Sequence, residues 1–253
     1  MIDMRRNGSI WPWLAPPWLF ALTLAVARPA FAVTYLEQAE RLQLINAFLL
    51  DYRPAAAPLL PKSSLIEIQA DLIPMPAIDN RVGAKNEPDN APPAVPRVRA
   101  RYIASWGLML GATAAPDIKV QGFSAPSLGG EAGLRFALGA LHGEARAFML
   151  SALVTGPITE PGESDEFDVT NSGADLRFGW ALGSIMPYVG SGQGHTASTL
   201  KVVSDGSQLD AEADYRYVFG GLTWYSGPLA FTYEQHRTED FLDHFILAAS
   251  ARF

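Results

Sequence analysis

Apolar and polar side chains alternate one by one along most of the chain that follows residue 63. Over 173–183 every second residue is apolar, and Asp175 and Arg177 occupy positions between them. Successive side chains of a β-strand point to opposite faces, so a period of two predicts strands with one apolar and one polar face. The pattern recurs over 97–111 and 130–140. It indicates an all-β fold.

Strand length and the content of the polar face distinguish a membrane barrel from a soluble sandwich. Many of the alternating segments run for about ten residues or more, as a tilted membrane strand requires, whereas soluble strands average about five or six. The polar face combines glycine with arginine and acidic residues in mid-strand. That mixture suits a narrow lumen, where small residues leave room for ion pairs. We therefore predict a closed antiparallel transmembrane β-barrel, with the soluble sandwich as the alternative.

The connections between these segments alternate between tight and long. Membrane barrels have short periplasmic turns and longer external loops. The tight connections are Ser226-Gly227, Gly183-Ser184 and 140–143, and the long ones are 200–209 and 156–169.

Two further alternating segments, 66–72 and 118–121, decide the number of strands. Counting both gives ten strands and omitting both gives eight; both numbers are even and place the two ends of the barrel on the periplasmic side. We favour ten, with 77–96 as the first outer loop. The predicted strands are 64–74, 97–111, 117–124, 128–140, 143–156, 168–182, 185–199, 211–225, 227–238 and 243–253.

The first 32 residues have the pattern of a secretory signal peptide. Arg5 and Arg6 precede an apolar segment over 18–27, and Ala30-Phe31-Ala32 supplies a small-residue cleavage site. Prolines at 12, 16 and 17 keep the apolar run shorter than the ~20 residues of a spanning helix. We expect cleavage near Ala32 and export to the bacterial outer membrane; an uncleaved anchor is the alternative.

Residues 33–63 are predicted to form a periplasmic helix followed by a Pro-rich linker, ahead of a barrel over 64–253. Apolar residues recur at helical spacing from Tyr35 to Tyr52, and Pro54 ends the pattern. Two placements remain open for this helix. It either packs at the periplasmic mouth of the barrel, which we favour, or plugs the lumen.

Composition excludes several classes of function. The formal net charge is −7, which offers no basic face to nucleic acid. The chain has no cysteine, so it has no disulfide, thiol nucleophile or thiolate metal site. We expect no cofactor and no bound metal.

Two segments carry a resemblance to known outer-membrane barrels. Met186-Pro-Tyr-Val-Gly-Ser-Gly-Gln-Gly194 resembles the Pro-Tyr-x-Gly-x-Gly-x-Gly strand of small OmpA-type barrels, with Tyr188 and the three glycines facing inward and Gln193 near the rim. The last strand places Phe245, Leu247 and Phe253 on one apolar face and ends on an aromatic residue. This ending is similar to the signal that such barrels present to the barrel-assembly machinery. The resemblance implies a fold and says nothing of an activity.

Three histidines are candidates for chemistry at the outer strand ends. His236 and His244 would flank one hairpin beside Glu239, Asp240 and Asp243. Imidazoles with carboxylates can bind a metal or act as a general base. Omptin proteases, which this chain resembles in having ten strands, use acidic and histidine residues at that end, but their paired aspartates have no matched positions here. We prefer the interpretation that rim residues are polar because they meet water.

His195 with Ser198 is a second candidate for catalysis. Membrane-embedded lipid A deacylases use histidine and serine on one strand face. A spacing of three puts His195 and Ser198 on opposite faces, so we predict no such dyad.

Charged residues predicted to face the lumen form the best-founded group. Unpaired ions in so narrow a space would be costly, so these residues must pair or stay hydrated. Paired charges would fill the interior; the alternative is a small ion-selective channel. The predicted lumen residues are Arg99, Arg101, Glu131, Arg135, Glu144, Arg146, Asp175, Arg177, Asp214, Arg216 and Glu234.

The sequence thus predicts a monomeric, lipid-embedded, non-enzymatic barrel with a structural or surface-binding role. A narrow pore is the first alternative and a hydrolase active at the rim is the second.

Overall fold

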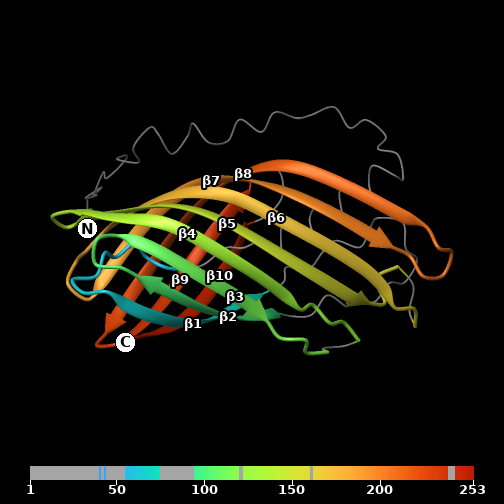
Figure 1. Ribbon diagram of the computed structural model, residues 1–253, viewed down its shortest axis with the longest axis horizontal. Helices are drawn as coiled ribbons and strands as arrows, with labels where there is room; N and C mark the ends of the chain where they lie inside the picture. Colours follow the sequence, from blue (N-terminus) through green and yellow to red (C-terminus); the bar gives the residue numbers. More distant parts are fainter. Residues whose placement is uncertain are drawn as a thin grey trace, which may run out of the picture. The chain divides into compact units, whose positions relative to one another are not determined.

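The computed structural model describes residues 40, 43, 55–74, 94–119, 122–159, 162–238 and 243–253. Ten antiparallel strands follow one another around a closed barrel, and the first pairs with the last (Figure 1). The strands are β1 (Leu65–Pro74), β2 (Ala94–Ile103), β3 (Leu108–Ala115), β4 (Ser127–Leu138), β5 (Leu141–Gly156), β6 (Asp165–Trp180), β7 (Ile185–Lys201), β8 (Gln208–Ser226), β9 (Leu229–Thr238) and β10 (Asp243–Arg252).

The ends of the sheet close on each other through the C-terminal residues. β1 pairs with β10 from Glu67↔Arg252 to Leu72↔Leu247. Ile66 and Phe253 exchange backbone hydrogen bonds of 3.0 and 2.9 Å below that ladder. Closure pairs both sides of every strand in the part of the barrel where all ten strands run. The predicted all-β closed barrel and its ten strands are confirmed.

Two predicted strands are wrong in position, although the total is right. The segment 97–111 is not one strand but the hairpin β2–β3, which turns at residues 104–107. Gly107 makes the turn with a φ of 109°, and a Cβ there would overlap the carbonyl oxygen of Arg135. The predicted strand 117–124 lies instead in the β3–β4 connection, where Ser124 and Thr155 form an isolated bridge. Alternation continued through the turn, so the pattern alone did not reveal it.

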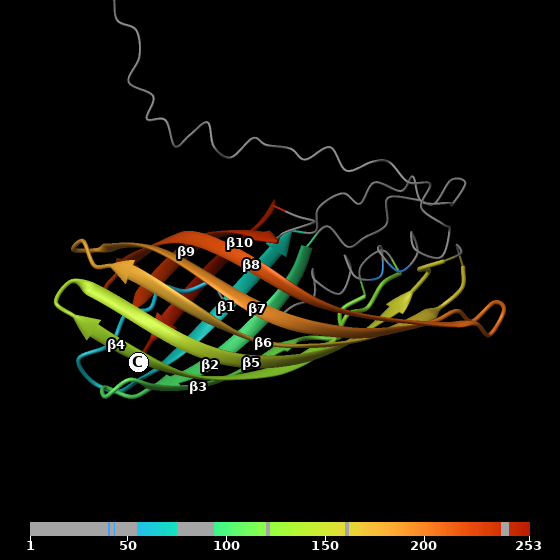
Figure 2. The same ribbon diagram turned by 90° about the horizontal axis from the view of Figure 1, so that it is seen from above.

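All tight turns lie at one end of the barrel, together with the start of β1 and the end of β10 (Figure 2). By the rule of short inner turns and long outer loops, this is the periplasmic end. The predicted first outer loop falls largely on 75–93, and the signal peptide falls on 1–32; both lie outside the described residues.

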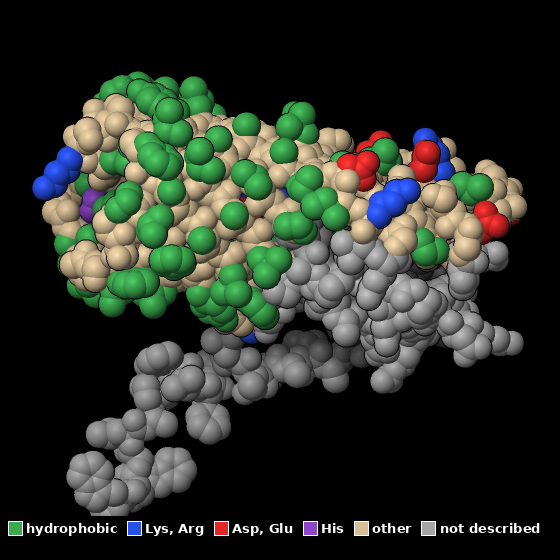
Figure 3. Space-filling view, turned by 90° about the horizontal axis from the view of Figure 1, so that it is seen from below, with side chains coloured by type: hydrophobic (Ala, Val, Ile, Leu, Met, Phe, Trp, Pro, Cys, Tyr) green, Lys and Arg blue, Asp and Glu red, His purple; other side chains and the backbone are tan. Residues whose placement is uncertain are grey.

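The outer wall of the barrel carries a band of apolar side chains (Figure 3). Large hydrophobic residues on this wall are 40–76 % exposed, which in water would be a severe cost and in a bilayer is the favoured state. Representative members from different strands are Ile68, Leu134, Phe178, Val189, Leu222, Phe231 and Leu247. The apolar face of each strand therefore meets lipid.

Strands β5–β8 extend past the other strands toward the outer end (Figures 1 and 2). They contain 16–19 residues each, against 8–12 in the other strands. In this extension the outer faces of β6, β7 and β8 become polar. The outer face of β8 carries Val218 and Leu222 within the band but Arg216, Asp214 and Glu212 beyond it. The outer face changes from apolar to polar at the row formed by Ala174, Gln193 and Arg216, which are register partners on β6, β7 and β8. Beyond this row the outer faces of β6, β7 and β8 carry mainly polar residues.

Residues 55–60 of the Pro-rich linker lie inside the barrel. Ala55, Ala56 and Ala57 are buried. The linker then runs toward the end with the tight turns, where the Ser64 hydroxyl accepts a hydrogen bond of 3.0 Å from the Ser105 backbone N–H. Only Glu40 and Gln43 of the predicted helix are described, and both are helical. The rest of that helix lies outside the described residues.

Candidate functional site: the barrel lumen

Charged side chains from six strands meet inside the barrel. Arginines and carboxylates are equal in number among these buried residues. From the predicted set, those that are buried and face the lumen are Arg99, Arg101, Glu131, Arg135, Glu144, Arg146, Asp175, Arg177 and Glu234. They are joined by Glu67, Asp71 and Arg97, with Gln69 among them. We call this group the charged layer.

The charged layer is continuous around one side of the lumen. Arg101 contacts Glu67 and lies 4.0 Å from Glu131. Glu131 in turn lies 3.0 Å from Arg146, which contacts Asp175. Each of these five ions therefore has an opposite charge beside it, as burial away from water requires.

Ion pairs of Glu144 and Arg177 extend the charged layer across the lumen. The Glu144 carboxylate lies 2.6 Å from the Arg135 Nε and 3.3 Å from the Arg177 Nε. Arg177 also lies 3.5 Å from Asp175 and 4.0 Å from Glu234. Arg177 is on β6 and Glu234 on β9, two strands that are not neighbours. This contact therefore spans the lumen itself.

Glycines on intervening strands make these long contacts possible. The Tyr188 hydroxyl on β7 donates a hydrogen bond of 2.5 Å to Glu234 on β9, passing over Gly221 on β8. A Cβ at Gly221 would come within 2.5 Å of the Tyr188 ring. Gly192 lies in the same way beneath the ring of Tyr217. Small residues thus leave the space that the larger polar groups occupy.

The glycine-rich strand faces as its motif predicts, but aromatic rings rather than charges cover most of its glycines. Tyr188 is buried, and Cβ atoms built at Gly190, Gly192 and Gly194 would strike Phe219, Tyr217 and Tyr215. These rings follow one another along β8 with centroids 5.9 Å apart. Gln193 points outward in the row where the outer face becomes polar.

The internal segment 55–60 is held by the charged layer. Arg177 donates a hydrogen bond of 2.7 Å to the Ala56 carbonyl oxygen, and Arg135 donates one of 3.0 Å to that of Leu59. Gln69 donates one of 2.8 Å to the Ala55 carbonyl oxygen. Side chains of the charged layer and the main chain of segment 55–60 therefore meet inside the lumen.

Asp214 and Arg216 do not face the lumen, contrary to the prediction. Both are exposed on the outer face of β8, and Tyr215 and Tyr217 occupy the inward positions. The prediction assumed that the apolar face of a strand always points outward. That holds only where the outside is lipid, and this part of β8 lies beyond the apolar band.

Three of the missed lumen residues carried a signal in the sequence. Glu67, Gln69 and Asp71 occupy the polar face of the first strand. Their pairing partners, Arg101 and Arg99, were already predicted to point inward. Applying the same face rule to β1 would have found them.

The histidines are not gathered at one rim site. His236 lies inside the lumen, where its Nε2 contacts Glu234 and its ring stacks on Phe219 with centroids 5.2 Å apart. His195 is on the outer face, 2.9 Å from the exposed Asp214. Ser198 is buried on the inner face, as the spacing of three predicts. The His244 backbone pairs with His236, and residues 239–242 lie outside the described residues.

No group of three or more histidine or acidic residues in the described part of the chain is arranged to hold a metal. Among the same residues, no helix is long and apolar enough to cross a membrane.

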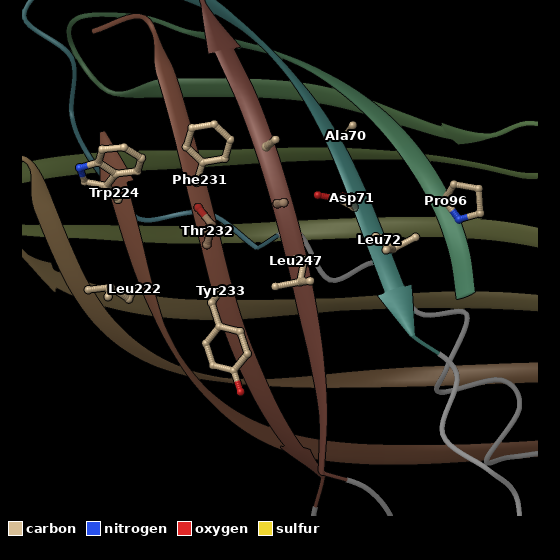
Figure 4. A pocket seen from close by; sticks show the side chains of 12 residues that line it. Ala70, Asp71, Leu72, Pro96, Leu222, Trp224, Phe231, Thr232, Tyr233 and Leu247 are labelled. Carbon is tan, nitrogen blue, oxygen red and sulfur yellow. The ribbon is translucent and has the colours of Figure 1, made fainter. Parts of the chain in front are cut away.

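A shallow hollow of about 710 Å³ lies on the outer wall, over β8, β9, β10, β1 and β2 (Figure 4). Ala70 and Ala249, which are paired neighbours, form part of its floor. Trp224, Phe231 and Tyr233 stand along one side. The hollow belongs to the apolar band, and the paired strands beneath it leave the wall intact.

Comparisons with known proteins concern the fold. No family model and no curated protein sequence matches the chain. Among solved structures, Neisserial surface protein A is similar with 12 % identity and a TM-score of 0.34, over 75 % of this chain and 95 % of that one. The translocator domain of autotransporter NalP from Neisseria meningitidis is similar with 11 % identity and a TM-score of 0.42, over 85 % and 93 %. The N-terminal β-barrel domain of Pseudomonas aeruginosa OprF is similar with 12 % identity and a TM-score of 0.31, over 76 % and 98 %. The closed strand order and the apolar outer band make this chain a ten-stranded transmembrane β-barrel of the outer-membrane type.

Proposed function

We propose that this protein is a non-enzymatic outer-membrane barrel with a structural or surface-binding role and a lumen closed to solutes. The observation that carries the proposal is the charged layer together with segment 55–60. The contact between Arg177 and Glu234 crosses the lumen, and Arg177 also binds the Ala56 carbonyl oxygen of the internal segment. A hydrated ion would have to break several such contacts to pass.

The part of the molecule available for binding is the β5–β8 extension. Its outer face is polar and lies beyond the apolar band, where it is open to partners in the surrounding water. Acidic residues predominate there, including Glu166, Asp168, Asp210, Glu212 and Asp214. We assign the surface-binding role to this face. The membrane-embedded part of the barrel supports it.

We also propose how the chain is processed and assembled. The signal peptide is cleaved after Ala32, the terminal strand is read by the barrel-assembly machinery, and the mature barrel is a monomer in the outer membrane. The mass of the purified mature chain tests the cleavage site, because a chain that starts at Val33 has a defined mass.

Single-channel recording in planar bilayers tests the closed lumen. We expect the mature chain, shown by flotation to be inserted in vesicles, to give no steady conductance above the leak level. Stepwise openings would overturn the proposal in favour of a narrow pore. In that case Glu144→Gln should shift the ion selectivity of the openings, because Glu144 is buried in the lumen, whereas Glu212→Gln on the outer face should not.

A further inference from the structure

The inner face of the β5–β8 extension is buried: β5 and β6 contribute large apolar residues, and Asn171, Thr196 and Ser198 are buried polar residues of the same face. Leu150, Val169 and Phe167 point inward from β5 and β6 and are 1 %, 0 % and 4 % exposed. Ala211 on β8 is 7 % exposed in the same surface. The face that is charged lower down is largely apolar here on β5 and β6, carries uncharged polar residues on β7, and is shielded from water.

Leu150, Phe167 and Val169 belong to one cluster with Tyr215 and Tyr217 of β8, so neighbouring strands shield part of this face. The remaining strands are 8–12 residues long and end below the outer part of β5–β8, so no strand stands opposite the extension (Figures 1 and 2). An open sheet with an apolar face in water would expose that face. The burial values are those of a surface that packs against another part of the chain.

The hydrogen bonds of Gln43 identify the part of the chain that lies against this face. The Gln43 side-chain amide donates to the carbonyl and hydroxyl oxygens of Ser198, both at 3.0 Å, and to the Leu209 carbonyl oxygen at 3.1 Å. Ser198 and Leu209 face inward on the outer parts of β7 and β8, and Gln43 itself is 4 % exposed. A helical residue 155 positions away in sequence is thus seated on the inner face of the extension.

The course of the chain agrees with this position. Ala55 lies at mid-height, where Gln69 holds it, and Leu60 lies nearer the tight turns, where its backbone N–H donates to His142 Nδ1 at 3.1 Å. From Ala55 to Leu60 the chain therefore runs toward the tight turns and the start of β1, and the opposite direction leads toward the outer end, where Gln43 lies.

The sequence around Gln43 has apolar residues at helical spacing, as a helix packed on this surface would need. Side chains three, four and seven positions apart share one side of a helix. A helix that seats Gln43 on the sheet puts Leu36, Ala39, Ala47 and Leu50 on the same side, together with Glu40 and Asn46. The apolar residues would meet the apolar part of the surface, and the Gln43 amide meets the polar atoms of Ser198 and Leu209.

We propose that the inner face of the β5–β8 extension is a docking site for the chain's own N-terminal segment, residues 34–53. The occupant enters from the outer end and is tethered through the lumen by segment 55–60. The N-terminal part of the mature protein is therefore held at the outer end of the barrel and not in the periplasm. This inference does not depend on whether the lumen conducts.

Cross-linking between introduced cysteines tests the docking, because the chain contains no cysteine of its own. The test variant is Gln43→Cys with Ser198→Cys, treated after assembly in vesicles with a short reagent that joins two thiols. We expect most of the barrel to shift in mobility on a denaturing gel. The matched control is Gln43→Cys with Thr199→Cys, which moves the second thiol one residue along β7 to the outer face, and it should give at most a tenth of that product.

A second pair separates failure of docking from failure of the chemistry. Thr223 and Thr232 are inward-facing neighbours on β8 and β9 with hydroxyl oxygens 2.8 Å apart. Cysteines at these two positions should react fully. A Gln43–Ser198 pair that stays unlinked while this pair reacts would overturn the proposal, as would equal products from Ser198 and Thr199.

Discussion

Replacing Glu144 with glutamine removes the charge that two buried arginines share. Arg135 and Arg177 lie 2.6 and 3.3 Å from its carboxylate, and the side chains of all three residues are at most 3 % exposed. Removing one partner of a buried pair costs about 3–5 kcal/mol, because the remaining charge stays buried without compensation. Arg177 keeps its contact with Asp175, so we expect the lower end of that range, about 3 kcal/mol.

A loss of about 3 kcal/mol is roughly a hundredfold in the unfolding equilibrium. Urea titration of the barrel in lipid vesicles, followed by tryptophan fluorescence, measures it. The control Glu212→Gln changes the same group on the exposed outer face of β8 and should stay within about 0.5 kcal/mol of the unmodified protein. The double variant Glu144→Gln with Arg135→Met should lose less than the sum of the two single variants, because the second change removes the stranded charge. If Glu144→Gln unfolds at the same urea concentration as the unmodified barrel, the lumen is hydrated and the charged layer is not a buried network.

Gly221→Val should lower the fraction of barrel that folds, because its Cβ would come within 2.5 Å of the Tyr188 ring, whereas Gly220→Ala beside it, whose Cβ meets nothing closer than 3.6 Å, should fold normally. The folded fraction is read from heat-modifiable mobility on a gel, and equal folding of the two variants would refute the spacing argument. Deletion of Phe253 should reduce the amount assembled in membranes, since this residue closes the ladder between β1 and the C-terminus and ends the proposed assembly signal. Unchanged assembly after the deletion would remove that signal from the account.

Much of the fold follows from local pattern. Period-two alternation predicts strands wherever one face is apolar, and the long segments that became β5, β7, β9 and β10 were placed within a few residues. Alternation cannot reveal a turn through which it continues, as at residues 104–107. The predicted strand 117–124 shows the reverse error, because a few alternating residues in a loop have the same pattern as a short strand.

The lumen could be predicted as far as the same rule applies. Arg135 and Arg177 stand on polar faces of segments whose other face is plainly apolar. Asp214 and Arg216 obey the alternation equally well, but their side of β8 meets water and not lipid. Which face of a strand is polar depends on the solvent at that height, and no local window of sequence contains this information.

The sequence by itself determined that this chain forms strands with one apolar and one charged face, because side-chain direction in a strand alternates whatever the surroundings. Only the tertiary structure decided where the two faces exchange character and which charges meet across the lumen. It also decided that segment 55–60 lies within the barrel. Those outcomes depend on contacts such as that between Arg177 and Ala56, which are 121 residues apart. Such contacts exist only after the barrel has closed.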